Sequence, residues 1–285
     1  MVTKVDVVPE ARLLFRLSNM ERMMDDYFKL PVDPRTQTIV VFYSRVPLLI
    51  ACYALLLSLH VYLRRYITTH QPKYDLTAII LIYNGFMFGS FGVGLILGLY
   101  CLDGFHHLMD CSDIDFNSTE VKAALQYVIA VTFHVFKLIK FLEPLLYKLA
   151  GKPSPVSDGH LLEQFVVHVL GFVVARYYAA NFFALVVLLD GVSSLVYYCW
   201  QTLEAGGHAA QARPIWGKIF LALCIVERVA PIIQAFFGLQ KKSCARMWPL
   251  IKMQICVVVF IILPLFLWDQ LNQRKSKKSR QLKED

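Results

Sequence analysis

Seven long apolar segments dominate the sequence, at about 39–63, 76–102, 123–149, 160–176, 178–203, 215–239 and 247–268. Most approach the roughly 20 residues that a helix needs to cross the hydrocarbon core of a bilayer. The 285-residue chain is 57% hydrophobic, well above a typical soluble domain. We therefore predict an all-α polytopic membrane protein with seven transmembrane helices. The fourth segment is short, and only Arg176 and Tyr177 separate it from the fifth, which suggests a tight hairpin.

Charge sets the expected orientation. The tail is basic, and basic residues next to a span favour the cytosolic side; its cations are Arg274, Lys275, Lys277, Lys278, Arg280 and Lys283. An odd number of spans then places the N-terminus in the lumen. We expect a lumenal segment at 1–35, one membrane domain at 36–268 and a cytosolic tail at 269–285. The net charge of +8 lies mostly in the tail and at span ends, so we predict no nucleic-acid partner.

The loop after the second span is expected to be lumenal. It is rich in Asp, and it holds the sequon Asn117-Ser118-Thr119, which can be glycosylated only on that side. The loop before the seventh span does not follow the rule that basic residues favour the cytosolic side. Its cations would be lumenal on this topology; these are Lys241, Lys242 and Arg246. On this topology Cys111 and Cys244 share an oxidising compartment, so they could pair or remain free thiols.

The third span carries a polar stripe. His134, Lys137, Lys140 and Glu143 recur at steps of three, which places them along one slanting face of a helix. Lys140 and Glu143 are spaced to pair, and Pro144 weakens the helix after them. The stripe could reach the headgroups, but His134 and Lys137 lie mid-span, so we favour an internal polar cavity.

The fifth span has a polar face as well. Asp190, Ser193, Ser194 and Tyr197 share it by their spacing. A carboxylate at membrane depth needs a partner, and a lysine of the third span is the expected one. The alternative is plain helix packing through the small residues.

The sixth span carries Glu227 next to Arg228. Adjacent residues point about 100° apart on a helix, so at least one needs a partner from another helix. Polar groups on several spans suggest that helices two to seven surround an internal tunnel. A substrate with a polar head and a long apolar tail would suit such a tunnel.

The segment "SDGHLLEQFVVH" opens the fourth span. It is either the start of an active site or a helix start capped near Asp158. A metal site from His160, Glu163 and His168 is disfavoured, because Glu163 and His168 lie five apart and do not share a helix face.

Several segments, in this order, resemble the very-long-chain fatty acid elongases, the 3-oxoacyl-CoA synthases of the endoplasmic reticulum. The likeness covers the chain from about Asp33 to the tail. It is carried by "DPR" at 33–35, "YDLTAIILIYN" at 74–84, "CSDIDF" at 111–116, "FKLIKFLEPLLYKLAGK" at 136–152 and "FFALVVLLDGVSSLVYYCW" at 182–200. The resemblance implies that Cys111 and Cys244 are paired.

The family's histidine box, H-x-x-H-H, falls on His160, Glu163 and Gln164, so only the first histidine is kept. Lys137 is retained, but other family residues are replaced. The family's Glu, Asp, Thr, Asn and His are here, in that order, Lys140, Glu143, Pro144, Asp190 and Ser194, and its Gln pair is Cys224 and Glu227. The resemblance implies catalytic positions at His160, Glu163, Gln164, Ser194 and Asp190, and substrate-binding positions at Lys137, Lys140, Glu143, Tyr197, Tyr198 and Glu227.

The family condenses a long-chain acyl-CoA with malonyl-CoA, with loss of carbon dioxide and no further cofactor. Imidazoles suit this chemistry, because they attack thioesters and move protons near neutral pH. Two histidines that the family uses for thioester attack and proton transfer are replaced in this chain by Glu163 and Ser194. A carboxylate is a labile acyl carrier, and Asp190 is a poor base for Ser194. Turnover is therefore expected to be weak or lost.

Three hypotheses remain at this point. The chain is an elongase with altered roles, an inactive relative that binds acyl-CoA or regulates active elongases, or an unrelated transporter or receptor. Other elongation enzymes, or a second elongase chain in a dimer, are expected partners beside the bilayer. We expect residence in the endoplasmic reticulum membrane, although Lys283 lacks the second lysine of a standard retrieval signal.

Overall fold

The computed structural model describes residues 22–23, 26–27, 46–70, 74–103, 111, 120–152, 156–177, 181–207 and 213–272. Within these ranges the chain is built from helices joined by turns, and no strand occurs among them. The predicted all-α class is confirmed for this part of the chain.

A helix lies at each of the seven predicted positions. The α-helices are α3 (Val46–His70), α4 (Thr77–Cys101), α5 (Val121–Lys140), α6 (Glu143–Leu149), α7 (Asp158–Tyr177), α8 (Asn181–Ala205), α9 (Arg213–Gln240) and α10 (Trp248–Val257). A 3-10 turn, η1 (Lys242–Met247), precedes α10, and a π-helical turn, η2 (Val258–Ile262), follows it.

Four of these helical segments are long and apolar enough to cross a membrane: Thr77–Cys101, Phe183–Ala205, Ile215–Gln240 and Lys242–Asn272. A shorter apolar helix covers Gly159–Val174. The described part of the chain is therefore compatible with a multi-pass membrane protein that contacts the lipid bilayer.

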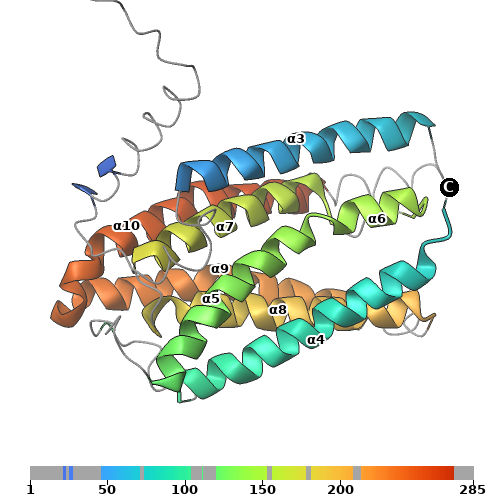
Figure 1. The fold of residues 1–285 in the computed structure, drawn as a ribbon. Coiled ribbons are helices and arrows are strands. Elements are labelled where there is room, and N and C mark those ends of the chain that lie inside the picture. Colours follow the sequence, from blue (N-terminus) through green and yellow to red (C-terminus); the bar gives the residue numbers. More distant parts are fainter. Residues whose placement is uncertain are drawn as a thin grey trace, which may run out of the picture.

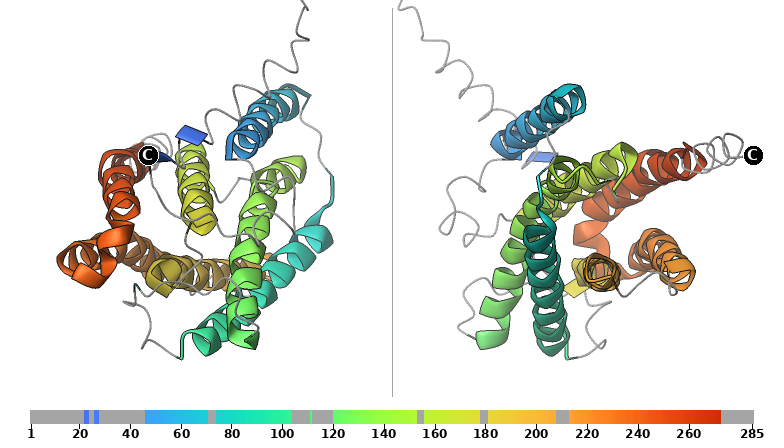
Figure 2. Two further views of the ribbon diagram at one scale, coloured as in Figure 1. Left: turned by 60° about the vertical axis from the view of Figure 1, so that its left-hand side comes forward. Right: turned by 90° about the vertical axis from the view of Figure 1, so that its right-hand side faces the viewer.

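Helices α4 and α8 pack side by side along much of their length (Figure 1). Two glycines allow the close approach: a Cβ on Gly98 would lie 3.2 Å from Leu188, and one on Gly191 would lie 2.9 Å from Leu95. Small residues at such crossings are the usual means by which membrane helices pack tightly. Helix α9 flanks α8, and α3 lies on the outer side of the bundle next to α6 and α7 (Figure 2).

The third predicted span is not one helix. Helix α5 ends at Lys140, Phe141 and Leu142 form a turn, and α6 begins at Glu143 with Pro144 in its first turn. A proline has no N–H to donate and its ring clashes with the preceding turn, so the first turn of a helix is its most favourable helical position. The expected weakening at Pro144 is therefore an interruption of the α-helix, at which Phe141 and Leu142 keep right-handed helical backbone angles.

Other boundaries also differ from the prediction. Helix α3 runs on to His70, seven residues beyond the predicted end at 63, because helical hydrogen bonding does not stop where apolar residues do. Helix α7 includes Arg176 and Tyr177, which were predicted to be the link to α8. The last helix continues to Asn272, and its π-helical turn ends two residues before Pro264, whose missing N–H favours such an irregularity.

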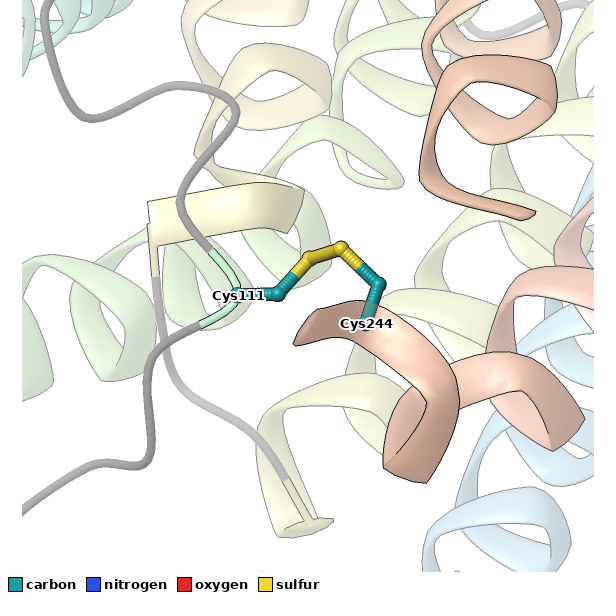
Figure 3. Close-up of a disulfide and its surroundings, with 2 residues drawn as sticks. All are labelled: Cys111 and Cys244. Atoms are coloured by element: carbon teal, nitrogen blue, oxygen red, sulfur yellow. A yellow bond between two sulfur atoms is a disulfide. The ribbon is translucent and has the colours of Figure 1, made fainter. Parts of the chain in front are cut away.

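A disulfide joins Cys111 to Cys244 in η1, with the two Cα atoms 5.1 Å apart (Figure 3). The pairing implied by the resemblance is present. It connects parts of the chain 133 residues apart and fixes the segment after α4 to the start of the last helix. Cys101, Cys199, Cys224 and Cys256 are free thiols. The predicted sequon at Asn117, the segment at 33–35 and the basic residues from 274 onward lie outside the described residues.

Candidate functional site

The centre of the bundle holds a buried ion pair between α5 and α8. The ammonium of Lys137 donates to Asp190 and also to the side-chain oxygen of Gln164 on α7. Lys137 and Asp190 are each only 1% exposed. The predicted pairing of Asp190 with a lysine of the third span is confirmed. An internal charge of this kind is tolerated in a low-dielectric interior only when it is paired.

A second buried ion pair joins α7 to α9. The guanidinium of Arg228 contacts Glu163 and donates to the carbonyl of Cys224 one turn earlier. Its neighbour Glu227 accepts a hydrogen bond from Ser193 on α8 at 2.9 Å. The two adjacent residues of α9 therefore reach different helices, and the prediction that at least one of them needs a partner from another helix is confirmed.

The predicted pair between Lys140 and Glu143 is wrong. Lys140 donates instead to Ser194 on α8 at 2.6 Å. Glu143 accepts hydrogen bonds from both tyrosines of α8, with Tyr198 at 2.9 Å. The break before Glu143 explains the difference, because the two residues belong to separate helices, and α8 offers each a partner. We call the residues of these contacts the polar network. Its centre is Lys137, Asp190, Gln164, Glu163 and Arg228, and its edge is Lys140, Glu143, Ser193, Ser194, Tyr197, Tyr198 and Glu227.

The side chain of Ser157 caps the start of α7. The backbone N–H of His160 donates to the hydroxyl of Ser157 at 3.1 Å, a standard way to satisfy a free donor of the first turn. The side chain of His160 is 27% exposed, and its Nδ1 lies 3.6 Å from Glu163. The described residues contain no group of three or more His, Cys, Asp or Glu arranged to hold a metal ion.

A cavity of about 640 Å³ lies beside the polar network, between α4, α5, α7, α8, α9 and the last helix. Its volume falls within the range of about 300–1,000 Å³ typical of small-molecule and cofactor pockets. Its wall is mainly aliphatic, aromatic and glycine residues. The polar residues with ionisable or amide side chains in the wall are Gln126, His134, Glu163, Glu227, Arg228 and Gln254.

The cavity opens to the outside of the bundle between α4 and α5. Phe86 and Val93 of α4 and Val128 of α5 line it, and each is more than half exposed. Gly85, Gly89 and Gly94 also line it, with nothing within 4 Å of the position of a Cβ. The hollow is therefore accessible from the side of α4, and the internal tunnel stays a prediction.

The structure separates the predicted site residues into two groups. Glu163 and Glu227 line the cavity. Eight others lie in the contacts of the polar network and are buried, except for the half-buried Lys140: Lys137, Lys140, Glu143, Gln164, Asp190, Ser194, Tyr197 and Tyr198. Ser194 and Asp190 contact different lysines, so they do not form a nucleophile–base pair.

One aromatic cluster was missed. The hydroxyl of Tyr53 on α3 hydrogen-bonds to the ring of His168, at 2.7 Å from Nε2, and the His168 ring lies 4.7 Å from that of His134. A histidine in the middle of an apolar helix is uncommon, so His168 was itself a signal of this cluster. Tyr53 carried no such signal, because tyrosines are frequent in this sequence.

No protein-family model matches the chain, and no curated protein matches it either.

Proposed function

We propose that this protein is an elongase-like membrane protein that binds a long-chain acyl-CoA, with the acyl chain in the cavity. The observation that carries the proposal is an apolar hollow of about 640 Å³ with buried charges gathered at one part of its wall. An amphiphile with a polar head and a long tail matches that division of chemistry. The family resemblance supplies the class of amphiphile.

The wider proposal has seven spans, with helices two to seven around the acyl chain. A helix at each predicted position and a cavity between α4, α5, α7, α8, α9 and the last helix support it. The disulfide supports an oxidising compartment for Cys111 and Cys244. The basic tail supports a cytosolic C-terminus. Together they favour a multi-pass protein of the endoplasmic reticulum with a lumenal N-terminus.

Condensation of acyl-CoA with malonyl-CoA is proposed to be weak or lost. Glu163, at the position of a box histidine, is committed to Arg228, so its carboxylate is not a free nucleophile. Ser194 contacts the ammonium of Lys140, which cannot remove its proton while charged. Asp190 is held by Lys137. Each replaced group has a structural partner, which favours binding over turnover and a regulatory role beside active elongases.

An active condensing enzyme is the second candidate. The observation that favours it is the partly exposed imidazole of His160, which keeps the first box position and lies near Glu163. An imidazole there keeps a group that can act as a general acid or base.

Binding is tested with purified protein and radiolabelled stearoyl-CoA. Gly94 lines the cavity and has open space at its Cβ, so Gly94→Phe should fill part of the hollow and weaken binding at least tenfold. Gly217 of α9 also has open space but is not part of the cavity wall, so Gly217→Phe is the matched control. Equal affinity in both variants would contradict binding in this cavity.

Turnover is tested in microsomes that contain the protein, with labelled malonyl-CoA and acyl-CoAs of several lengths. The native chain should give little or no longer product. The histidines are restored with Glu163→His, Gln164→His and Ser194→His, together with Arg228→Gln, because Arg228 would otherwise lose its carboxylate. Robust elongation by the unaltered chain would instead establish the second candidate.

A further inference from the structure

Three buried polar atoms, each on a residue that lines the cavity, have no hydrogen-bond partner in the described part of the chain. They are Nδ1 of His134 on α5, Nε of Arg228 on α9 and Oε1 of Gln254 on the last helix. The three residues are between 2% and 5% exposed. Buried polar atoms are nearly always paired, so three from separate helices around one hollow indicate a ligand that pairs with them.

His134 is the most informative of the three. Its ring is surrounded by rings, with His168, Phe133 and Phe172 at centroid distances of 4.7, 5.7 and 5.9 Å. Gly171 of α7 lies against another side of the ring, where a Cβ would be only 3.3 Å from Cε1 of His134. These contacts hold the imidazole in place but give its Nδ1 no hydrogen bond among the described residues. A neutral imidazole can donate one hydrogen bond and accept another.

The other two atoms extend the same chemistry. Gln254 uses its amide nitrogen toward the carbonyl of Pro231 at 3.5 Å, which leaves its oxygen as an acceptor. Arg228 uses its terminal nitrogens on Cys224 and Glu163, which leaves Nε–H as a donor. The wall thus offers a donor, an acceptor and a group that can be either. A saturated hydrocarbon chain can pair with none of them.

We propose that the acyl chain bound in this cavity carries a hydroxyl group that hydrogen-bonds to His134. The inference rests on the proposed function and names its substrate class, a hydroxylated acyl chain. A hydroxyl can donate and accept, so it can use the imidazole together with a second wall atom. The cavity should therefore bind a hydroxylated chain more tightly than an unsubstituted chain of the same length, because the unsubstituted chain leaves these polar atoms unpaired.

The place of His134 also suggests where the oxygen lies. The cavity-lining part of α5 runs from Leu125 to Phe136, and Lys137 of the polar network follows directly. His134 precedes Lys137 by three residues, or about 4.5 Å of helix rise. If the thioester head lies at the polar network, the oxygen belongs near the head and not near the far end of the chain.

The test compares binding of stearoyl, 3-hydroxystearoyl and 17-hydroxystearoyl chains, both as CoA thioesters and as free acids, to the purified protein. The expected result is about tenfold tighter binding of the 3-hydroxy chain than of the plain chain. His134→Phe should remove that preference while the plain chain still binds. His134→Asn keeps a hydrogen-bonding side chain and should retain part of it. His70→Phe, on the exposed end of α3, is the control.

The outcomes separate this inference from the proposed function. Equal binding of plain and 3-hydroxy chains overturns the inference and leaves acyl-CoA binding intact. A preference that survives His134→Phe also overturns it. A preference among free acids that depends on His134, without binding of any CoA thioester, supports the oxygen contact and contradicts the proposed function. Failure of every chain to bind contradicts both.

Discussion

The polar network and the cavity wall share Glu163 and Arg228, but the polar side chains that belong to only one of them have different partners. In the network, Lys137 and Arg228 each meet a carboxylate from a different helix. In the wall, His134 and Gln254 keep polar atoms that no described residue satisfies. The contrast teaches how to divide buried polar residues in a membrane protein. An ion pair between two helices holds the bundle together, whereas a wall residue with an unpartnered polar atom can contact a ligand.

The largest effect is expected where a network charge loses its partner. Lys137→Met should lower the free energy of unfolding by about 3–5 kcal/mol, because Asp190 is left buried without a counter-charge. The measurement is denaturant or thermal unfolding of the protein in detergent micelles. The double variant Lys137→Met/Asp190→Leu removes both charges and should recover most of the loss. A double variant no more stable than the single one would show that the pair is not the stabilising unit.

A smaller loss is expected at the edge of the network. Tyr198→Phe removes one of two hydroxyl donors to the buried Glu143, and hydrogen bonds to charged groups contribute about 1.5–3 kcal/mol. The loss should appear as a lower midpoint of thermal unfolding. Tyr62→Phe, an exposed tyrosine of α3, serves as the control. Equal midpoints for the two variants would mean that Glu143 does not need this donor.

A methyl group added where α8 packs against α4 should lower stability more than one added at the open cavity wall of α4. Gly191→Ala places a methyl group 2.9 Å from Cδ2 of Leu95, so this side-chain end, which also lines the cavity, must rotate aside at a cost of about 0.5–1.5 kcal/mol. Gly94→Ala meets no atom within 4 Å and should be neutral or slightly stabilising, since alanine favours helix more than glycine does. Unfolding of both variants under the same conditions checks the contrast. Equal stability would mean that the α4–α8 contact is loose.

Much of this could be predicted from the sequence, because the cost of burying a polar group is a strong constraint. Apolar runs located the helices, and the carboxylate of Asp190 required a lysine nearby. The angular separation of Glu227 and Arg228 required partners on other helices. These predictions needed only helix geometry and the low dielectric of a membrane interior.

The rest depended on how helices pack, which one sequence does not encode locally. Lys140 and Glu143 were spaced to pair, but the break at Pro144 and two tyrosines of α8 gave each a different partner. Which carboxylate would meet Arg228 depended on the contact between α7 and α9. The cavity itself follows from the shapes of six neighbouring helices, and Gly94 gave no local sign that it lines an open wall.

A small effect on stability is expected at a residue that should change the binding preference about tenfold. His134→Phe removes a buried imidazole that has no hydrogen-bond partner among the described residues, and it keeps an aromatic ring among aromatic neighbours. The free energy of unfolding should change by less than about 1 kcal/mol and can increase, because a phenyl ring carries no desolvation cost. His168→Phe is the comparison, since it breaks the hydrogen bond with Tyr53. If His134→Phe destabilised the protein as much as Lys137→Met, the imidazole would belong to the polar network, and the division between paired residues that hold helices and unpaired residues that contact ligand would be lost.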